Sequence, residues 1–126
     1  MTTILVAGTW DTKDAELGYM RDVILRQGGQ VLTMDVSVLG DPSQPTDISK
    51  HEVAEAAGSS IAEAIAAEDE NTAMQVMATG SARLAALFAA VLGLLFGFLY
   101  VVLNLDSLSL LAGAVGAIYV LLRNMG

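Results

Sequence analysis

TILVAGTWDTK, residues 3–13, sets a short apolar run directly before a polar turn. The run over residues 3–7 is almost uninterrupted and is bounded by Gly8. This pattern is typical of a strand that is buried on both faces of a parallel sheet. The polar turn that follows then marks the place where a strand ends and a helix begins.

A helix and a second strand are predicted after this turn. Asp11 can cap a helix, and apolar residues recur at helical spacing until Gly28 and Gly29, where glycine can adopt the left-handed conformation that ends helices. Residues 30–39, QVLTMDVSVL, follow as the second strand and its exit. Two strands joined by one helix predict a right-handed parallel βαβ unit.

Three short helices are expected before the apolar part of the chain. A loop over residues 40–47 carries both prolines and separates the second strand from them. Two Ser-x-x-Glu patterns match capping boxes, and an asparagine can cap the third helix, which a glycine then ends. The residues that give these signals are Ser49 with Glu52, Ser60 with Glu63, and Asn71 with Gly80.

Charge is divided unevenly along the 126 residues. Residues 1–83 hold five Lys or Arg and 13 Asp or Glu, a net charge of −8, whereas residues 84–126 hold one of each and are neutral. Because the chain has no basic cluster, we expect no nucleic-acid partner. It has no cysteine, which excludes disulfides and thiolate metal sites. The N-terminal sequence lacks the basic and apolar regions of a signal peptide, so residues 1–83 are expected in the cytoplasm.

The stretch LAALFAAVLGLLFGFLYVVLNL, residues 84–105, has no charged residue. It belongs to two apolar segments, 84–103 and 108–122, joined by residues 104–107. The first segment meets the length of about 20 residues that a membrane span needs, and the second is shorter. A hairpin of two membrane helices is therefore predicted, with the lipid bilayer as its partner.

Charges at the ends of this hairpin predict its orientation. Arg83 and Arg123 flank it, so the positive-inside rule places both ends in the cytoplasm and Asp106 at the outer tip. Gly93 and Gly97 form a GxxxG pattern that would let helices approach closely, within one chain or in a homo-oligomer. Glycine is also simply common in membrane helices, and this alternative stays open.

The predicted fold is α/β, with a partial Rossmann-like βαβ unit and short helices over residues 1–83. An all-α hydrophobic hairpin, transmembrane in this interpretation, follows over residues 84–126. A second interpretation needs no membrane, because two strands alone cannot bury much apolar surface and the hairpin could pack on the sheet as a replacement core.

The turn GTWDTK, residues 8–13, is the candidate functional site. Ligands bind at such turns in α/β sheets because the first N–H groups of the helix are unpaired and its dipole favours an anion. Thr9 and Thr12 can donate hydroxyl hydrogen bonds, and Lys13 can neutralise a phosphate. Asp11 could cap the helix or meet a metal-bound or ribose group. The pattern is neither a Walker A loop nor GxGxxG, and an ordinary capped turn is the alternative.

Three segments resemble the N-terminal part of the Tm-1-like ATP-binding proteins, the UPF0261 family, over residues 3–87. They are VAGTWDTKDAEL, LRQGGQVLTMDVSVLGDPSQPTDISKHEVAEAAGSS and ATGSARL. The resemblance implies a Rossmann-like fold that binds a nucleotide, with ATP and an accompanying divalent cation as the expected cofactors. The residues that match the family's binding positions are Gly8, Thr9, Asp11, Thr12 and Lys13 in the first turn, and Asp35, Val36 and Gly40 at the exit of the second strand.

The resemblance also implies a third strand and a glycine-rich GGSGGT-type loop next, where this chain has LFAAVLGLLFGFLY. Residues 96–116, FGFLYVVLNLDSLSLLAGAVG, resemble instead a membrane hairpin of CreD-type inner-membrane proteins. We therefore expect a truncated or fused nucleotide-binding module, tethered to the inner membrane and without an assigned catalytic residue. The alternative is a small CreD-like membrane or envelope protein whose α/β part binds nothing.

The remaining candidate residues favour structural roles. His51 is the single histidine and is expected on the solvated surface. The carboxylates of residues 68–70 diverge around a helix end and predict a solvated face rather than a cation site. Met74 and Met77 are expected to pack in the core. Trp10 could cover a nucleotide or merely shield the turn.

Overall fold

The computed structural model describes the backbone of residues 2–103 and 108–125, and the side chains of residues 2–103 and 116–125. The predicted hairpin turn with Asp106 lies outside the described residues. The chain divides into two compact units, Met1–Ala86 and Leu87–Gly126. The elements are β1 (Thr3–Gly8), α1 (Asp14–Arg26), β2 (Gln30–Asp35), α2 (Lys50–Ala56), α3 (Ile61–Ala66), α4 (Glu70–Leu103) and α5 (Leu108–Met125).

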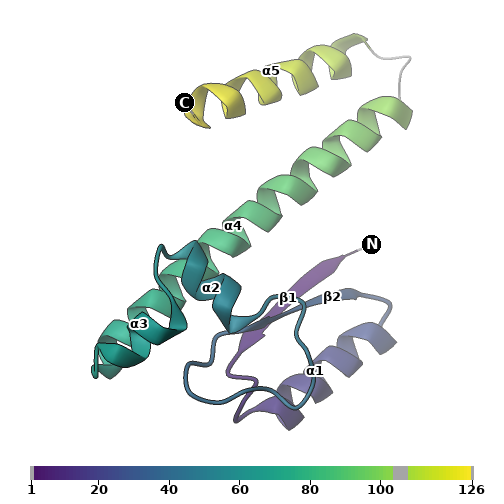
Figure 1. Ribbon diagram of the computed structural model, residues 1–126. Helices are drawn as coiled ribbons and strands as arrows, with labels where there is room; N and C mark the ends of the chain where they lie inside the picture. Colours follow the sequence, from purple (N-terminus) through teal and green to yellow (C-terminus); the bar gives the residue numbers. More distant parts are fainter. Residues whose placement is uncertain (1, 104–107, 126) are drawn as a thin grey trace. The chain divides into compact units, whose positions relative to one another are not determined.

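The two strands of the first unit pair in parallel, as the sequence predicts (Figure 1). Their register runs from Thr3 opposite Gln30 to Gly8 opposite Asp35. Strand β2 ends at Asp35 because the Asp35 carboxylate turns back and accepts a hydrogen bond from the N–H of Ser37 at 2.9 Å. This local bond between a side chain and the backbone two residues on replaces the strand pairing.

Helix α1 begins at Asp14 with Lys13 at its N-cap position, two residues later than a cap at Asp11 predicts. The Asp11 carboxylate accepts from the N–H of Gly40 at 3.2 Å and is therefore not available as the cap. Residues 9–13 form a turn instead, in which Lys13 N–H donates to the Thr9 carbonyl at 2.9 Å. The predicted end of the helix is confirmed, since Gly28 has a φ of 85°.

Both predicted capping serines start a helix. The Ser49 capping box is complete, with reciprocal bonds between Ser49 and Glu52. Ser60 accepts from the N–H of Glu63 at 3.1 Å, but the Glu63 carboxylate accepts from the Ser59 hydroxyl at 2.8 Å. The second box is therefore only half formed.

Helix α4 differs from the prediction at both ends. Asn71 is not its cap, because Asp69 accepts from the N–H groups of Asn71 and Thr72 at 3.3 and 3.0 Å. The helix does not end at Gly80 either and continues to Leu103, over 34 residues. The third predicted helix and the first apolar segment are thus one helix.

Gly80 serves close packing rather than helix termination. It is buried, and a Cβ added to it would lie 1.8 Å from the Val53 carbonyl oxygen of α2. Helices α2 and α4 therefore touch through their backbones at this point. The buried apolar residues around this contact and the sheet are Val6, Trp10, Met34, Ile48, Val53, Ala54, Ile61, Ala64 and Met77.

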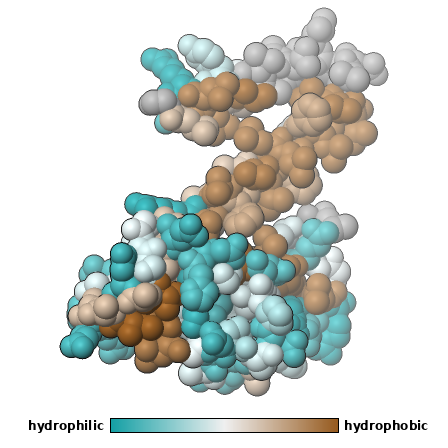
Figure 2. Space-filling view, viewed as in Figure 1, coloured by the Kyte–Doolittle hydropathy of each residue, from teal (hydrophilic) through white to brown (hydrophobic). Residues whose placement is uncertain are grey.

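The second unit is largely apolar over its described surface, apart from a hydrophilic part near the C-terminus (Figure 2). Within residues 2–103 and 108–125, one helix, α4, is long and apolar enough to cross a membrane. Most of its large side chains from Leu87 to Leu103 are exposed. Among the described residues, no atom beyond the adjoining backbone of α4 and the two chain neighbours lies within 4 Å of a Cβ placed on Gly93 or Gly97, so they make no close packing at the GxxxG pattern.

Replacing Gly80 by Ala should destabilise the first unit by about 1–3 kcal/mol, because the new methyl group must push α2 away from α4. The single tryptophan, Trp10, is 2% exposed, so its fluorescence during urea unfolding of the detergent-solubilised chain reports this change. Gly18→Ala is the control. A Cβ at Gly18 approaches only the Arg21 guanidinium at 3.9 Å, so this variant should gain about 0.5–1 kcal/mol. Equal stability of the two variants would contradict the close contact.

Candidate functional site

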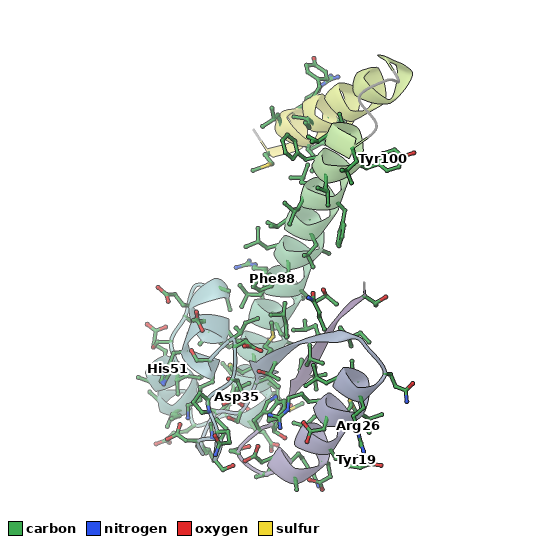
Figure 3. All side chains as sticks on the ribbon, turned by 90° about the vertical axis from the view of Figure 1, so that its right-hand side faces the viewer. Tyr19, Arg26, Asp35, His51, Phe88 and Tyr100 are labelled. Atoms are coloured by element: carbon green, nitrogen blue, oxygen red, sulfur yellow. The ribbon has the colours of Figure 1, made fainter. Side chains whose placement is uncertain are left out.

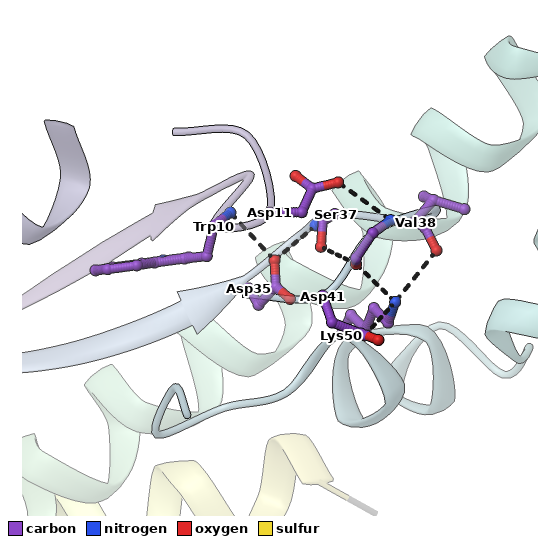
Figure 4. Close-up of polar contacts among 8 residues, drawn as sticks. Trp10, Asp11, Asp35, Ser37, Val38, Asp41 and Lys50 are labelled. Atoms are coloured by element: carbon purple, nitrogen blue, oxygen red, sulfur yellow. Dashed lines mark hydrogen bonds and ion pairs between the residues drawn. The ribbon is translucent and has the colours of Figure 1, made fainter. Parts of the chain in front are cut away.

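The carboxyl ends of β1 and β2 place the two predicted binding segments side by side. Val36 N–H donates to the Gly8 carbonyl at 2.9 Å. Gly40 N–H donates to Asp11 Oδ2 at 3.2 Å (Figure 4). The carboxyl edge of a parallel sheet is where α/β proteins bind ligands. The structure therefore brings residues 8–13 and 35–40 together at the edge where a ligand site is expected.

Asp35 holds these two segments together. Its side chain is 1% exposed and lies inside the first unit (Figure 3). Oδ1 accepts from the N–H of Trp10 at 3.3 Å and from the N–H of Ser37 at 2.9 Å. One carboxylate oxygen therefore binds the turn after β1 and the exit of β2 at the same time.

Lys50 is a second organising residue, which the sequence did not single out. Its side chain is 8% exposed and pairs with Asp41 at 2.8 Å. Nζ also donates to the carbonyls of Gly40 at 2.8 Å and Val38 at 3.4 Å, so its three protons all have acceptors. A lysine in the first turn of a helix is unfavourable to the helix dipole, and this was the signal that Lys50 has another role.

A cavity of about 720 Å³ opens beside this edge of the sheet. It lies between the loops after the two strands and helices α3 and α4. Of the eight predicted site residues, Thr9, Asp11, Thr12 and Val36 line it, and Gly8, Lys13, Asp35 and Gly40 do not. The other lining residues are Ser37, Val38, Leu39, Ala64, Ile65, Glu68, Asp69, Glu70, Ala73, Met74, Met77, Ala78 and Ser81.

Hydroxyl groups and a helix N-terminus flank the cavity. Thr12 Oγ1 donates to Thr9 Oγ1 at 3.3 Å. The N-cap position of α1 is Lys13, which makes no side-chain cap bond, so the first N–H groups of α1 can serve a ligand. The Lys13 side chain is 63% exposed, and its Nζ lies 3.6 Å from Glu16 Oε1. It reaches solvent rather than the cavity.

The acidic residues 68–70 are exposed, as predicted, but they also line the cavity. Asp69 caps α4, and the hydrogen bond from the Thr72 hydroxyl lowers the pKa of Asp69 below the ordinary value of 3.8. Glu68, directly before Asp69, has a φ of 51° and therefore lies in the left-handed region of backbone conformation. The predicted solvated face is confirmed, and the capping role of Asp69 was not predicted, although an aspartate directly before a helix is the usual signal for it.

Two buried polar atoms have no partner among the described residues, Trp10 Nε1 and Asp11 Oδ1. Trp10 is not part of the cavity wall, so here it shields the turn. Asp11 belongs to the wall, and its free Oδ1 can accept a hydrogen bond. In the described part of the chain, no group of three or more His, Cys, Asp or Glu residues is placed to hold a metal ion.

The remaining candidates occupy the places that their types suggest, with one exception. His51 is exposed (Figure 3). Met77 is 4% exposed and packs in the core, as predicted. Met74 is 62% exposed, so the prediction that it packs in the core is wrong. The helical spacing does not reveal that this side of α4 faces an open cavity.

Comparisons with known proteins match the N-terminal part of the chain. Residues 2–95 match the family described as "Uncharacterised protein family (UPF0261) N-terminal domain". A UPF0261 protein from Brucella suis is 51% identical over 81 residues, 64% of this chain and 19% of the relative. Another from Clostridium tetani is 40% identical over 79 residues, 63% of this chain and 20% of the relative. The chain thus spans about a fifth of the length of the curated relatives it matches. No solved structure matches it.

The pair of Asp41 and Lys50 should make stability depend on pH in the acid range. The hydrogen bond and the charge of Lys50 lower the pKa of Asp41 below its ordinary value of 3.8. A carboxyl with a lowered pKa stabilises the fold fully above its unfolded pKa, and this stabilisation is lost as pH falls through the folded pKa. We therefore expect the contribution of Asp41, which is small because its side chain is 84% exposed, to be complete above about pH 5 and to be lost as pH falls from 3.8 through the lowered pKa of the folded state.

Urea unfolding followed by Trp10 fluorescence between pH 2.5 and 6 measures this dependence. Asp41→Asn should lose less stability than the unchanged chain over the acid end of that range. Lys50→Met should lower stability at pH 6 by about 1–3 kcal/mol, because two carbonyls lose a charged donor. Lys13→Met removes an exposed lysine and should change little. Similar losses from the two lysine variants would count against the organising role of Lys50.

Proposed function

This chain belongs to the UPF0261 family, and we propose that its first unit is a nucleotide-binding module with ATP as its ligand. The single observation that carries the proposal is the cavity at the carboxyl ends of β1 and β2, which the GTWDTK turn and the exit of β2 border. Its volume of about 720 Å³ lies within the range of roughly 300–1,000 Å³ that small-molecule sites occupy.

The residues at this edge fit a nucleotide in several ways. The start of α1 offers N–H groups without a side-chain cap, and such groups bind phosphates. Thr9 and Thr12 add hydroxyl donors, and Lys13 adds a positive charge that can move toward a phosphate because it is exposed. The free Oδ1 of Asp11 can accept a hydrogen bond from a ligand. A divalent cation would bind together with the ATP phosphates. We propose binding of ATP only and assign no reaction to the module.

We further propose that the apolar part of α4 and α5 anchors this module in the inner membrane, with the first unit in the cytoplasm. Residues 84–103 contain no charge, and 20 helical residues span about 30 Å, the thickness of the hydrocarbon core. Arg83 comes directly before them and donates to the Ala56 carbonyl at 3.0 Å. A positive charge at this boundary favours the cytoplasmic side.

ATP binding can be tested by isothermal titration of the detergent-solubilised chain with millimolar ATP and Mg²⁺. Thr12→Val keeps the shape of the side chain and removes a hydroxyl donor, so it should weaken ATP binding by about tenfold. Thr3→Val is the matched control, because Thr3 lies at the opposite end of β1. The proposal fails if the unchanged chain gives no saturable heat, or if both valine variants bind like it.

Membrane anchoring can be tested by carbonate extraction of cell membranes that contain the chain. The unchanged chain should stay in the pellet. Leu94→Arg places a charge in the middle of the uncharged segment at a cost of about 2.5–3.5 kcal/mol, so more of this variant should reach the supernatant. Gln75→Arg adds the same charge to the exposed first part of α4 and should stay in the pellet. Release of the unchanged chain would favour the interpretation without a membrane.

A further inference from the structure

The cavity of the first unit has charged groups of one sign only. Among the described residues that line it, four are carboxylates, Asp11, Glu68, Asp69 and Glu70, and none is Lys, Arg or His. Lys50, which lies close by in the fold, has all three protons engaged by Val38, Gly40 and Asp41. The cavity is therefore an unfavourable place for a polyphosphate, because its negative charges would be repelled by these carboxylates.

The rest of the wall is apolar. Helices α3 and α4 contribute Ile65, Met74 and Met77, and the exit of β2 contributes Val38 and Leu39. In Figure 2 a hydrophobic area is seen beside α3 on the otherwise largely hydrophilic first unit. Such a wall suits a flat aromatic ring, and carboxylates at its rim suit groups that donate hydrogen bonds.

We infer that this cavity takes the nucleoside end of the ligand, a neutral part that carries hydroxyl and amino donors, and that the phosphates stay outside it at the start of α1. The inference rests on the proposed nucleotide binding and adds the orientation of the nucleotide in the site. Asp11 adds a second observation, because this residue belongs to the cavity wall and its Oδ1 is buried without a donor among the described atoms. A ribose hydroxyl or an adenine amino group supplies that donor, whereas a phosphate oxygen has none to give.

Three ligands distinguish the parts of this inference in titrations of the intact, detergent-solubilised chain without divalent cations. Adenosine should bind saturably and compete with ATP, and inorganic tripolyphosphate should not displace adenosine, because it lacks the part that enters the cavity. If ATP binds and tripolyphosphate competes while adenosine does not bind, the inference is overturned and the proposed nucleotide binding stands. If none of the three binds, both fail.

Neutral variants of the acidic rim give a second measurement that does not depend on overall stability. Glu68→Gln with Glu70→Gln should improve the affinity for ATP relative to adenosine by about three- to tenfold, because the phosphates are then less repelled. Glu55→Gln changes an exposed α2 carboxylate outside the cavity and should leave this ratio unchanged. An unchanged ratio in the double variant would overturn the assignment of the nucleoside end to the cavity.

Discussion

The Asp35 carboxylate is the contact on which the geometry of the first unit depends. Two parallel strands cannot form a stable sheet by themselves, and their loops need an additional tie. Asp35 Oδ1 supplies it by accepting from Trp10 and Ser37, on opposite sides of the edge. Because the oxygen is buried, loss of either bond would leave a polar group without water, so the arrangement is strongly preferred. The cavity beside these loops owes its shape to this tie.

Local sequence signals predicted most of the first unit correctly. The parallel strands, the left-handed Gly28 and the Ser49 capping box each depend on residues within a few positions or on one hydrophobic pattern. The predictions for Asp11 and Gly80 were wrong because each residue contacts a distant partner. Asp11 contacts Gly40, 29 residues away, and Gly80 contacts Val53, 27 residues away. A long-range partner overrides a local cap or stop signal, and single-sequence patterns do not contain it.

The candidate site was also predicted only in part. Family resemblance and the carboxyl-edge rule selected both binding segments, which do lie together, but only half of the selected residues line the cavity. The α3 and α4 side of the cavity was missed, because α4 was expected to end at Gly80 and residues 68–70 were taken as solvent-facing alone. The organising role of Lys50 was not predicted, because its three acceptors come from a loop whose path the sequence does not specify.

The strand pairing and the contact between the two loops both lie within the first unit, which bears on the synthesis of the chain. The strand pairing joins residues 27 positions apart, and the Asp11 contact with Gly40 joins residues 29 apart. All of these residues belong to Met1–Ala86, so these contacts need nothing from the apolar residues that follow. The first unit can therefore fold while the ribosome is still adding the uncharged segment after Arg83. The apolar residues then leave the ribosome after the first unit has folded. Whether they insert in a membrane or pack on protein depends on which apolar surface they contact first.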